Sequence, residues 1–470
     1  MPEGASPPAP TAKVHRPGGK SASSGDLLEL VDRVVGWAGP GEQVEAYAAR
    51  GHHTSVRVFD GEVESLSSAD TSGIGVRVVV GGRQGFAYAG SLDESVLAET
   101  LAEARDNAAF GTVDEFLGLA GPDGVEPAEL DLFRPEMAAF PADRKVELAL
   151  EVERATRAAD PRIRGVETAS YGDTIAESAL ASTQGIRTTA QRTVCYVNAD
   201  AIAGAGTESQ TGYGYSVGRQ PDELDVAKAA ADAAERATRM LGARKPASRR
   251  VTVLFDPMIT SRFLGVLSSA LSAEAALKGR SMFAGREGEA VAVPFLTLAD
   301  DPTEPRAFGS GPYDAEGLAS RRNLLIEEGV LRGFLHNTYT GRRSGRPSNA
   351  SAVRGGFKST PGVGSRALAL APGTRTQEEL MSDAGDGLLV QSVTGMHSGA
   401  NPVSGDFSVG VEGLMIRDGA PAEPVREATV ASTLQRMLLD VTAVGGDLEW
   451  LPGGSAGVTL VIRDVTLSGS

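Results

Sequence analysis

Residues 56–90 read VRVFDGEVESLSSADTSGIGVRVVVGGRQGFAYAG, and this stretch decides the fold class. Val, Ile, Phe, Tyr and Thr recur there in brief segments that turn-forming residues separate, and the same pattern begins near residue 43. β-branched and aromatic runs with glycine punctuation are typical of short strands joined by hairpins. The predicted breaks are Gly51, Asp60-Gly61, Gly73 and Gly81-Gly82. Residues 43–90 are therefore expected to form a β-meander.

Helical patterns frame this meander, and the whole arrangement recurs further along the chain. Helices are predicted over about 26–36, 93–107, 142–158 and 222–241, with further strands over about 162–217. The string Glu64-Ser65-Leu66 before Gly73-Ile74 resembles Glu177-Ser178-Ala179 before Gln184-Gly185-Ile186. Two copies of a helix, meander, helix module in one mixed α/β domain explain the recurrence. Chance similarity between two strand pairs is the alternative.

The C-terminal half is expected to be rich in strands. The basic run RKPASRR, residues 244–250, is typical of a linker. After it, a strand over 251–255 leads to Asp256-Pro257, which can cap a helix running to about Lys278. Short strands and turns dominate the remainder, apart from a second helix that begins at Ser432. The predicted fold class is α+β, with a C-terminal sandwich or barrel carrying two helices.

The predicted domain organisation has four parts. They are a disordered tail (1–24), an N-terminal α+β domain (25–243), the linker (244–250) and a β-rich C-terminal domain (251–470). A chain of 470 residues is too long for a single small binding module.

Charge and composition exclude several classes of function. The net charge of −16 opposes binding to phosphate backbones and anionic lipid, so neither nucleic acid nor membrane is an expected partner. The first 24 residues lack the apolar core of a signal peptide, and no apolar run reaches 18 residues. The sole cysteine, Cys195, can form no intrachain disulfide. A cytoplasmic location is expected.

The residues alone complete no catalytic constellation. None of the five histidines precedes a glutamate, which excludes the H-E-x-x-H zinc helix. The string GGSAG, residues 453–457, matches G-x-S-x-G, but Pro452 precedes it, a strand-like run follows and no histidine lies downstream. That string is predicted to be a turn. Cys195 lies in a strand-like run and is predicted to be a buried structural thiol.

Several C-terminal strings read together resemble a known family. They are LADDPTEP (298–305), GSGPYDAEG (309–317), NLLIEEGVLRGFLHNTYTGRRSG (323–345) and GLLVQSVTGMHSGANPVSGDFSVGVEGLMIRDG (387–419). Together with the N-terminal meander, they are similar to the TldD/PmbA family of bacterial peptidases over about residues 42–468. In that family, two related chains form a heterodimeric zinc metalloprotease that trims or degrades unfolded or small peptides.

The resemblance also implies what this chain lacks. The catalytic chain of the family carries H-E-x-x-x-H on the first helix of its C-terminal domain and a cysteine near its C-terminus, as zinc ligands. The corresponding helix here reads LSSALS (267–272), and Ser455 stands in the GGSAG segment. Serine is a far poorer zinc ligand than a thiolate. The chain therefore resembles the TldE/PmbA member, with no catalytic residue, metal site or cofactor of its own and with zinc expected in a TldD-like partner.

A noncatalytic subunit of this kind is expected to help enclose a chamber that admits only unfolded peptide. Residues predicted to line that cavity or the partner interface are Asn337, Thr338, Tyr339, Arg342 and His397. The alternative is that they are hairpin and loop residues of the core fold.

Two other functions stay open on the sequence. One is a peptidase that acts by itself through a divergent metal site built from His336, His397 and carboxylates such as Asp406. The other is a binding or regulatory homologue without proteolytic activity.

Overall fold

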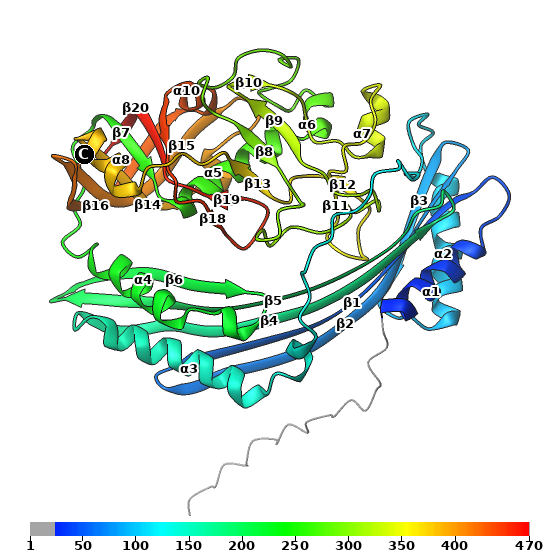
Figure 1. Ribbon diagram of the computed structural model, residues 1–470, viewed down its shortest axis with the longest axis horizontal. Coiled ribbons are helices and arrows are strands. Elements are labelled where there is room, and N and C mark those ends of the chain that lie inside the picture. The colour runs from blue at the N-terminus through cyan, green and yellow to red at the C-terminus, as the bar shows by residue number, and fades with distance from the viewer. Residues whose placement is uncertain (1–23, 470) are drawn as a thin grey trace, which may run out of the picture.

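The computed structural model describes residues 24–469, so all of the predicted tail except Ser24 lies outside the described residues. A long curved sheet forms the N-terminal half, and its concave face looks toward the β-rich C-terminal half (Figure 1). Helices cover the convex face of the sheet. The α+β class predicted from the sequence is confirmed.

The N-terminal sheet has six antiparallel strands in the order β3-β2-β1-β4-β5-β6. The strands are β1 (Gln43–Phe59), β2 (Glu62–Val80), β3 (Arg83–Ala89), β4 (Ile163–Ser182), β5 (Arg187–Ala205) and β6 (Glu208–Gly218). The helices are α1 (Ser24–Gly36), α2 (Glu94–Phe110), α3 (Ala142–Ala159) and α4 (Val226–Thr238), with short 3-10 turns η1 (Pro135–Ala139) and η2 (Pro221–Glu223). The N-terminal sheet and its helices thus consist of two modules, and each module is a helix, a three-stranded meander and a helix, as the predicted duplication requires.

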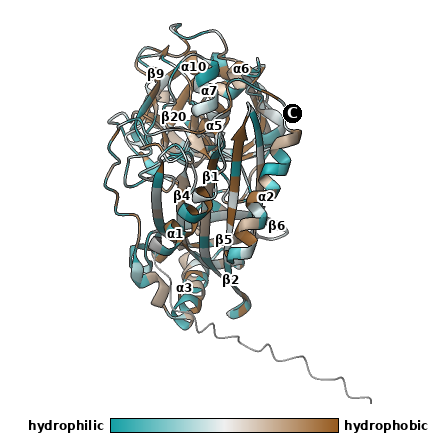
Figure 2. Ribbon diagram, turned by 90° about the vertical axis from the view of Figure 1, so that its right-hand side faces the viewer, coloured by the Kyte–Doolittle hydropathy of each residue, from teal (hydrophilic) through white to brown (hydrophobic). Residues whose placement is uncertain are grey.

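Alternation along the strands explains why the helices settle on one face. Even-numbered residues of β1 such as Val44 and Ala46 are buried against α1 and α2. In the second module, α4 packs closely on β6 because Gly214 has no side chain: a Cβ there would lie 2.0 Å from the Ala229 carbonyl oxygen. In Figure 2, the hydrophobic residues of the strands are brown and the hydrophilic ones teal.

The strands are longer than the sequence suggested, and the predicted breaks at Gly51 and Gly73 are wrong. Both glycines lie inside strands, since β1 has 17 residues and β2 has 19. A Cβ at Gly73 would lie 2.4 Å from the Phe357 ring, so this glycine makes room for a C-terminal loop rather than for a turn. The predicted turn at Asp60-Gly61 is confirmed by positive φ angles of 53° and 80°.

The internal sequence similarity does not mark equivalent positions in the two modules. Glu64 lies on β2, the second strand of its module, whereas Glu177 lies on β4, the first strand of the other.

The α4 helix is shorter than predicted, because the Asp225 side chain accepts a hydrogen bond from the Lys228 amide and caps the helix there.

The C-terminal half is built around a closed barrel. Its strands are β7 (Arg249–Phe255), β14 (Gly387–Thr394), β15 (Asp406–Arg417), β16 (Ala420–Thr433) and β20 (Leu460–Ser468), and β17 (Val441–Val444) pairs with the first residues of β20. The ring closes because β16 pairs with both β15 and β20. The strand β7 begins inside the predicted linker, so residues 249 and 250 belong to the barrel; the predicted domain boundaries otherwise stay predictions.

Smaller sheets and short helices complete this half. The strands are β8 (Leu298–Asp300), β9 (Asn323–Glu327), β10 (Val330–Leu331), β11 (Ala352–Val353), β12 (Gly362–Val363), β13 (Leu368–Leu370), β18 (Glu449–Trp450) and β19 (Ala456–Gly457). The helices are α5 (Pro257–Ala270), α6 (Ala273–Leu277), α7 (Thr338–Arg343), α8 (Gln377–Ala384), α9 (Met396–Gly399) and α10 (Leu434–Leu439). No helix in the described part of the chain is both long and apolar enough to cross a membrane.

Two helices were predicted in this half, and both segments are helical with modified ends. The first stops at Ala270 and resumes as α6, because the backbone at Leu271 and Ala273 exchanges hydrogen bonds with Leu335. The second is α10, which Thr433 caps in place of Ser432. The short helices α7, α8 and α9 were not predicted, since isolated segments of one or two turns carry little periodicity.

Candidate functional site

A cavity of about 400 Å³ lies between the concave face of the N-terminal sheet and the C-terminal half. Its walls come from β1, β4 and β5 on one side and from loops around β11 and β19 on the other. The lining residues are Tyr47, Ser178, Leu180, Thr188, Ala190, Arg192, Phe308, Gly309, Tyr313, Asp314, Ala315, Ala352, Val353, Arg354, Ser365, Arg366, Gly453 and Gly454. This volume is within the range of roughly 300–1,000 Å³ that is common for ligand sites.

A buried network of ion pairs joins the two halves beside this cavity. Glu45 on β1 accepts hydrogen bonds from Arg77 on β2 at 2.7 Å and from Arg354 at 2.8 Å. The Arg354 guanidinium also stacks over the Tyr47 ring, 4.4 Å from its centroid. Despite its burial, Glu45 has a lowered pKa because the two arginines outweigh the loss of water. Desolvated charges held this way fix the sheet against the C-terminal half.

Asp314 lies on the wall of the same cavity, and its pKa shifts in the opposite direction to that of Glu45. Loss of water and the neighbouring Glu316 raise its pKa to about 6. Its carboxylate accepts hydrogen bonds from the amides of Glu316 and Leu318, at 2.9 and 3.0 Å, which is the geometry of a turn. Arg366 also lines the cavity, and its guanidinium donates a hydrogen bond to the Tyr313 carbonyl at 2.7 Å.

Serine hydroxyls meet at the edge of the cavity. Ser261 on α5 lies 2.9 Å from Ser455, and Ser268 on the same helix lies 2.7 Å from Ser365. A Cβ at Gly457 would lie 2.2 Å from the Pro257 carbonyl oxygen, so the β19 segment presses directly on α5. The helix α5 is thus in contact with the GGSAG segment. The resemblance places the zinc ligands of the catalytic chain in these two segments, but here the side chains that meet between them are serine hydroxyls.

Four of the five predicted site residues lie together at α7, three on the helix and one at its N-cap. Asn337 caps the helix, and Thr338 donates to Glu316 through both its amide and its hydroxyl, at 2.8 and 2.7 Å. Tyr339 donates to Asp114 at 2.8 Å, and Arg342 donates to the Leu119 carbonyl at 2.9 Å. These contacts tie α7 to the segment that follows α2. A role for them in a cavity or partner interface stays a prediction.

The fifth predicted site residue, His397, is exposed and lies on a different helix, α9. His336 is buried, and burial lowers its pKa. Asp406 begins β15 and accepts a hydrogen bond from Ser404 at 2.7 Å. Within residues 24–469, no three His, Cys, Asp or Glu side chains gather in an arrangement that could hold a metal ion.

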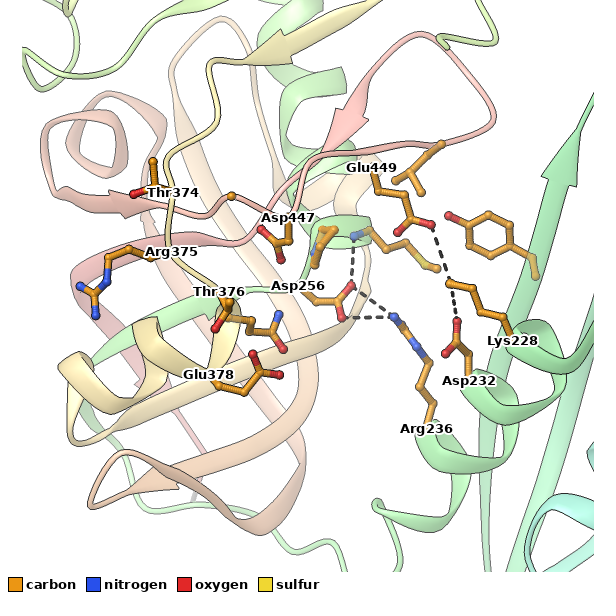
Figure 3. Close-up of a pocket in the computed structure, with 16 residues that line it drawn as sticks. Lys228, Asp232, Arg236, Asp256, Thr374, Arg375, Thr376, Glu378, Asp447 and Glu449 are labelled. Carbon is orange, nitrogen blue, oxygen red and sulfur yellow. Dashed lines mark hydrogen bonds and ion pairs between the residues drawn. The ribbon is translucent and has the colours of Figure 1, made fainter. Parts of the chain in front are cut away.

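A second cavity, of about 630 Å³, opens between α4 and the start of α5. Figure 3 shows Lys228 and Arg236 of α4 reaching toward the carboxylates across it. Arg236 pairs with Asp256 at 3.2 Å, and Lys228 pairs with Asp232 at 2.7 Å and lies 3.8 Å from Glu449. Because its two α4 cations are already paired, this cavity is a polar contact between the halves and a weaker candidate for a ligand site.

Family models of PmbA/TldA metallopeptidases match most of the chain. Domain 1 matches residues 44–108, the central domain residues 136–241 and the C-terminal domain residues 248–469. The chain belongs to the PmbA/TldD metallopeptidase family. The first two matches fall on the two modules of the N-terminal sheet, and the third covers the barrel.

Relatives within the PmbA/TldD family span nearly the full length. The chain is 26% identical to Metalloprotease PmbA of Escherichia coli O157:H7 over 88% of this chain and 89% of that protein. It is 28% identical to a metalloprotease of Methanothermobacter thermautotrophicus over 94% and 98%. The crystal structure of TldE from Thermococcus kodakarensis superposes with a TM-score of 0.85 at 21% identity, covering 95% of this chain and 100% of that one, which establishes the shared fold.

Reasoning from the sequence missed the arginines that line the first cavity. Neither Arg192 nor Arg354 nor Arg366 was predicted as a site residue from the sequence. One signal was available: Glu45 is a charge in the otherwise small and apolar strand VEAYA. A charged residue in such a strand indicates a buried partner somewhere in the chain.

Proposed function

We propose that this chain is the TldE/PmbA-like, noncatalytic subunit of a cytoplasmic heterodimeric zinc metalloprotease that processes or degrades unfolded or small peptides. Its partner is a TldD-like chain that carries the zinc. The observation that supports this assignment is the contact between Ser261 and Ser455, 2.9 Å apart. Neutral hydroxyls that bond to each other offer neither the imidazole nor the thiolate that a structural or catalytic zinc requires.

The cavity suggests how such a subunit contributes to proteolysis. Strands β1, β4 and β5 line it on one side and loop residues on the other, and we expect an extended chain to lie along the strands. A folded protein cannot present its backbone inside a space of about 400 Å³. A subunit that lines the route in this way restricts cleavage in the partner to unfolded peptide, without supplying any reacting group.

Metal analysis and co-expression test the proposal. The chain purified alone is expected to hold no stoichiometric zinc and to leave an unfolded peptide intact. Co-expressed with a relative that carries His-Glu-x-x-x-His, it is expected to form a stable complex whose peptide cleavage a chelator abolishes. Stoichiometric zinc with cleavage by the chain alone would contradict the noncatalytic assignment, and failure to associate with any such relative would contradict the subunit assignment.

A further inference from the structure

We propose that the first cavity, between the concave face of the N-terminal sheet and the C-terminal half, binds a carboxylate of an extended peptide. Arg192 is the residue that pairs with this carboxylate. This inference rests on the proposed function and adds a chemical requirement on the peptide: a negative charge at the end or side chain that enters the cavity. In a chain with a net charge of −16, a cationic cavity selects such peptides against the surrounding field.

Arg192 differs from the other charged residues of the cavity. It lies on β5, its side chain is exposed, and it makes no hydrogen bond or ion pair with any residue from 24 to 469. Arg354 already pairs with Glu45, and Arg366 already donates to Tyr313 and Ser320. One guanidinium with its full set of donors is therefore available to a ligand.

Two other arginines, Arg219 and Arg366, lie close enough to Arg192 for its charge to act on them. The charge of Arg192 adds to the larger effect of burial in lowering the pKa of Arg219; at Arg366 it adds to burial in the same way, while Asp314 and Asp300 act in the opposite sense. The Arg219 side chain donates to the backbone carbonyls of Pro305 and Ala307, and within residues 24–469 its guanidinium forms no ion pair, although its backbone amide donates to the Glu223 carboxylate at 2.7 Å. The carboxylate on the cavity wall, Asp314, has a pKa raised to about 6, so it carries a full negative charge only above that pH. An anion placed beside Arg192 relieves this mutual repulsion.

The rest of the wall favours a peptide over a small inorganic anion. Leu180, Phe308 and Val353 present apolar surface to the cavity, and an inorganic phosphate would leave that surface unfilled. A peptide with a carboxylate can satisfy both features: its charged group forms a two-pronged pair with the guanidinium, and its aliphatic part covers the apolar wall.

Three fluorescently labelled peptides without lysine or arginine test this inference by anisotropy on the full chain and on its complex. The first has a free C-terminal carboxylate and no acidic side chain, the second is the same peptide amidated, and the third is amidated with one glutamate. The carboxylate peptides are expected to bind at least about tenfold more tightly than the neutral one, since a charge-assisted hydrogen bond is roughly that strong. A preference for the first or the third tells whether the terminus or a side chain enters the cavity.

Arg192→Gln is expected to remove this preference while leaving the fold intact, because Arg192 is exposed. The matched control is Arg332→Gln, which changes an exposed arginine paired with Glu327 outside the cavity and should keep the preference. Equal binding of charged and neutral peptides by the unaltered chain would overturn this inference, and so would a preference that survives Arg192→Gln. Neither result would contradict the proposed function. Competition by inorganic phosphate without any preference for charged peptide would also overturn this inference. Failure of all three peptides to bind, with no complex formed, would overturn the proposed function instead.

Discussion

Arg354 donates a hydrogen bond from Nη2 to Oε1 of Glu45 at 2.8 Å, across 309 positions of sequence and with both side chains almost fully buried. Arg77 bonds to the other carboxylate oxygen at 2.7 Å. One carboxylate therefore holds two guanidiniums, one from each half of the molecule. This buried pair joins β1 to the loop that follows β11.

Glu45→Gln is expected to lower the free energy of unfolding by about 3–5 kcal/mol, because it leaves Arg77 and Arg354 buried without their shared counter-charge. Urea denaturation of the full chain measures this. Glu289→Gln, which breaks the exposed pair with Arg286, is the control and should change stability by less than about 1 kcal/mol. Similar effects of the two substitutions would contradict the role assigned to Glu45.

Asp314→Asn is expected to change the pH dependence of stability. The fold raises the pKa of Asp314 from 3.8 to about 6, so the fold favours the protonated acid. This contribution is fully present below about pH 4 and is lost as the pH rises through 6, by up to about 3 kcal/mol. Asparagine does not titrate. The free energy of unfolding of the natural chain minus that of the variant should therefore fall between pH 4 and 7.

Denaturation series at several pH values give this difference directly. Effects of Glu45 and other groups with lowered pKa values occur in both proteins and cancel. A difference that stays constant from pH 4 to 7 would show that Asp314 is not perturbed in the folded chain.

Ser455→Ala removes a hydroxyl bonded to Ser261 and is expected to lower stability by about 1 kcal/mol, a typical value for one hydrogen bond. Cleavage by the complex with a zinc-bearing relative should stay within about twofold, because Ser455 is not assigned any reacting role. A loss of kcat on the scale of removing a nucleophile, at least about a thousandfold, would refute the noncatalytic assignment.

Gly75→Ala is expected to destabilise the protein by about 1–3 kcal/mol or more, since the new Cβ would lie 2.3 Å from the Phe357 carbonyl oxygen. The C-terminal loop must then move off β2. Gly165→Ala on β4 is the matched control, because nothing lies within 4 Å of its Cβ position. That change should be neutral or stabilising by up to about 1 kcal/mol. Thermal unfolding of both variants tests the close approach.

Cys195 is expected to be inert toward thiol reagents in the folded protein at pH 8. Burial and the nearby Asp173 raise its pKa to about 12, so almost no thiolate forms. Labelling with a chromogenic disulfide should reach one thiol per chain only after denaturant is added. Rapid labelling of the native chain would contradict the burial of this side chain.

Local pattern predicted the elements that local forces determine. The helix over 142–158 was found because its apolar residues recur at helical spacing, and the turn at Asp60-Gly61 because both residues tolerate positive φ. Gly51 and Gly73 were misread because a glycine needed for close packing has the same letter as one needed for a turn. The sequence gives no sign of which backbone will approach it.

The cavity was beyond reach for a related reason. Arg192, Arg354 and Arg366 come from strands and loops that only the packing of the two halves brings together. Each is unremarkable among its sequence neighbours. The resemblance pointed to α5 and to Ser455, but the residue that contacts Ser455, Ser261, lies outside the 267–272 segment that it named.

The pairing of β1 with β4 runs from Glu45–Ser182 to Val58–Ala169, nearly the whole length of both strands. The two modules are therefore halves of a single cooperative unit, although their repeated plan suggests separable building blocks. A fragment cut between α2 and α3 would carry an unpaired edge along almost all of β1, and such an edge recruits other strands. Truncation studies, and any exchange of parts between relatives, should keep residues 24–241 intact and divide the chain only in the connector before β7.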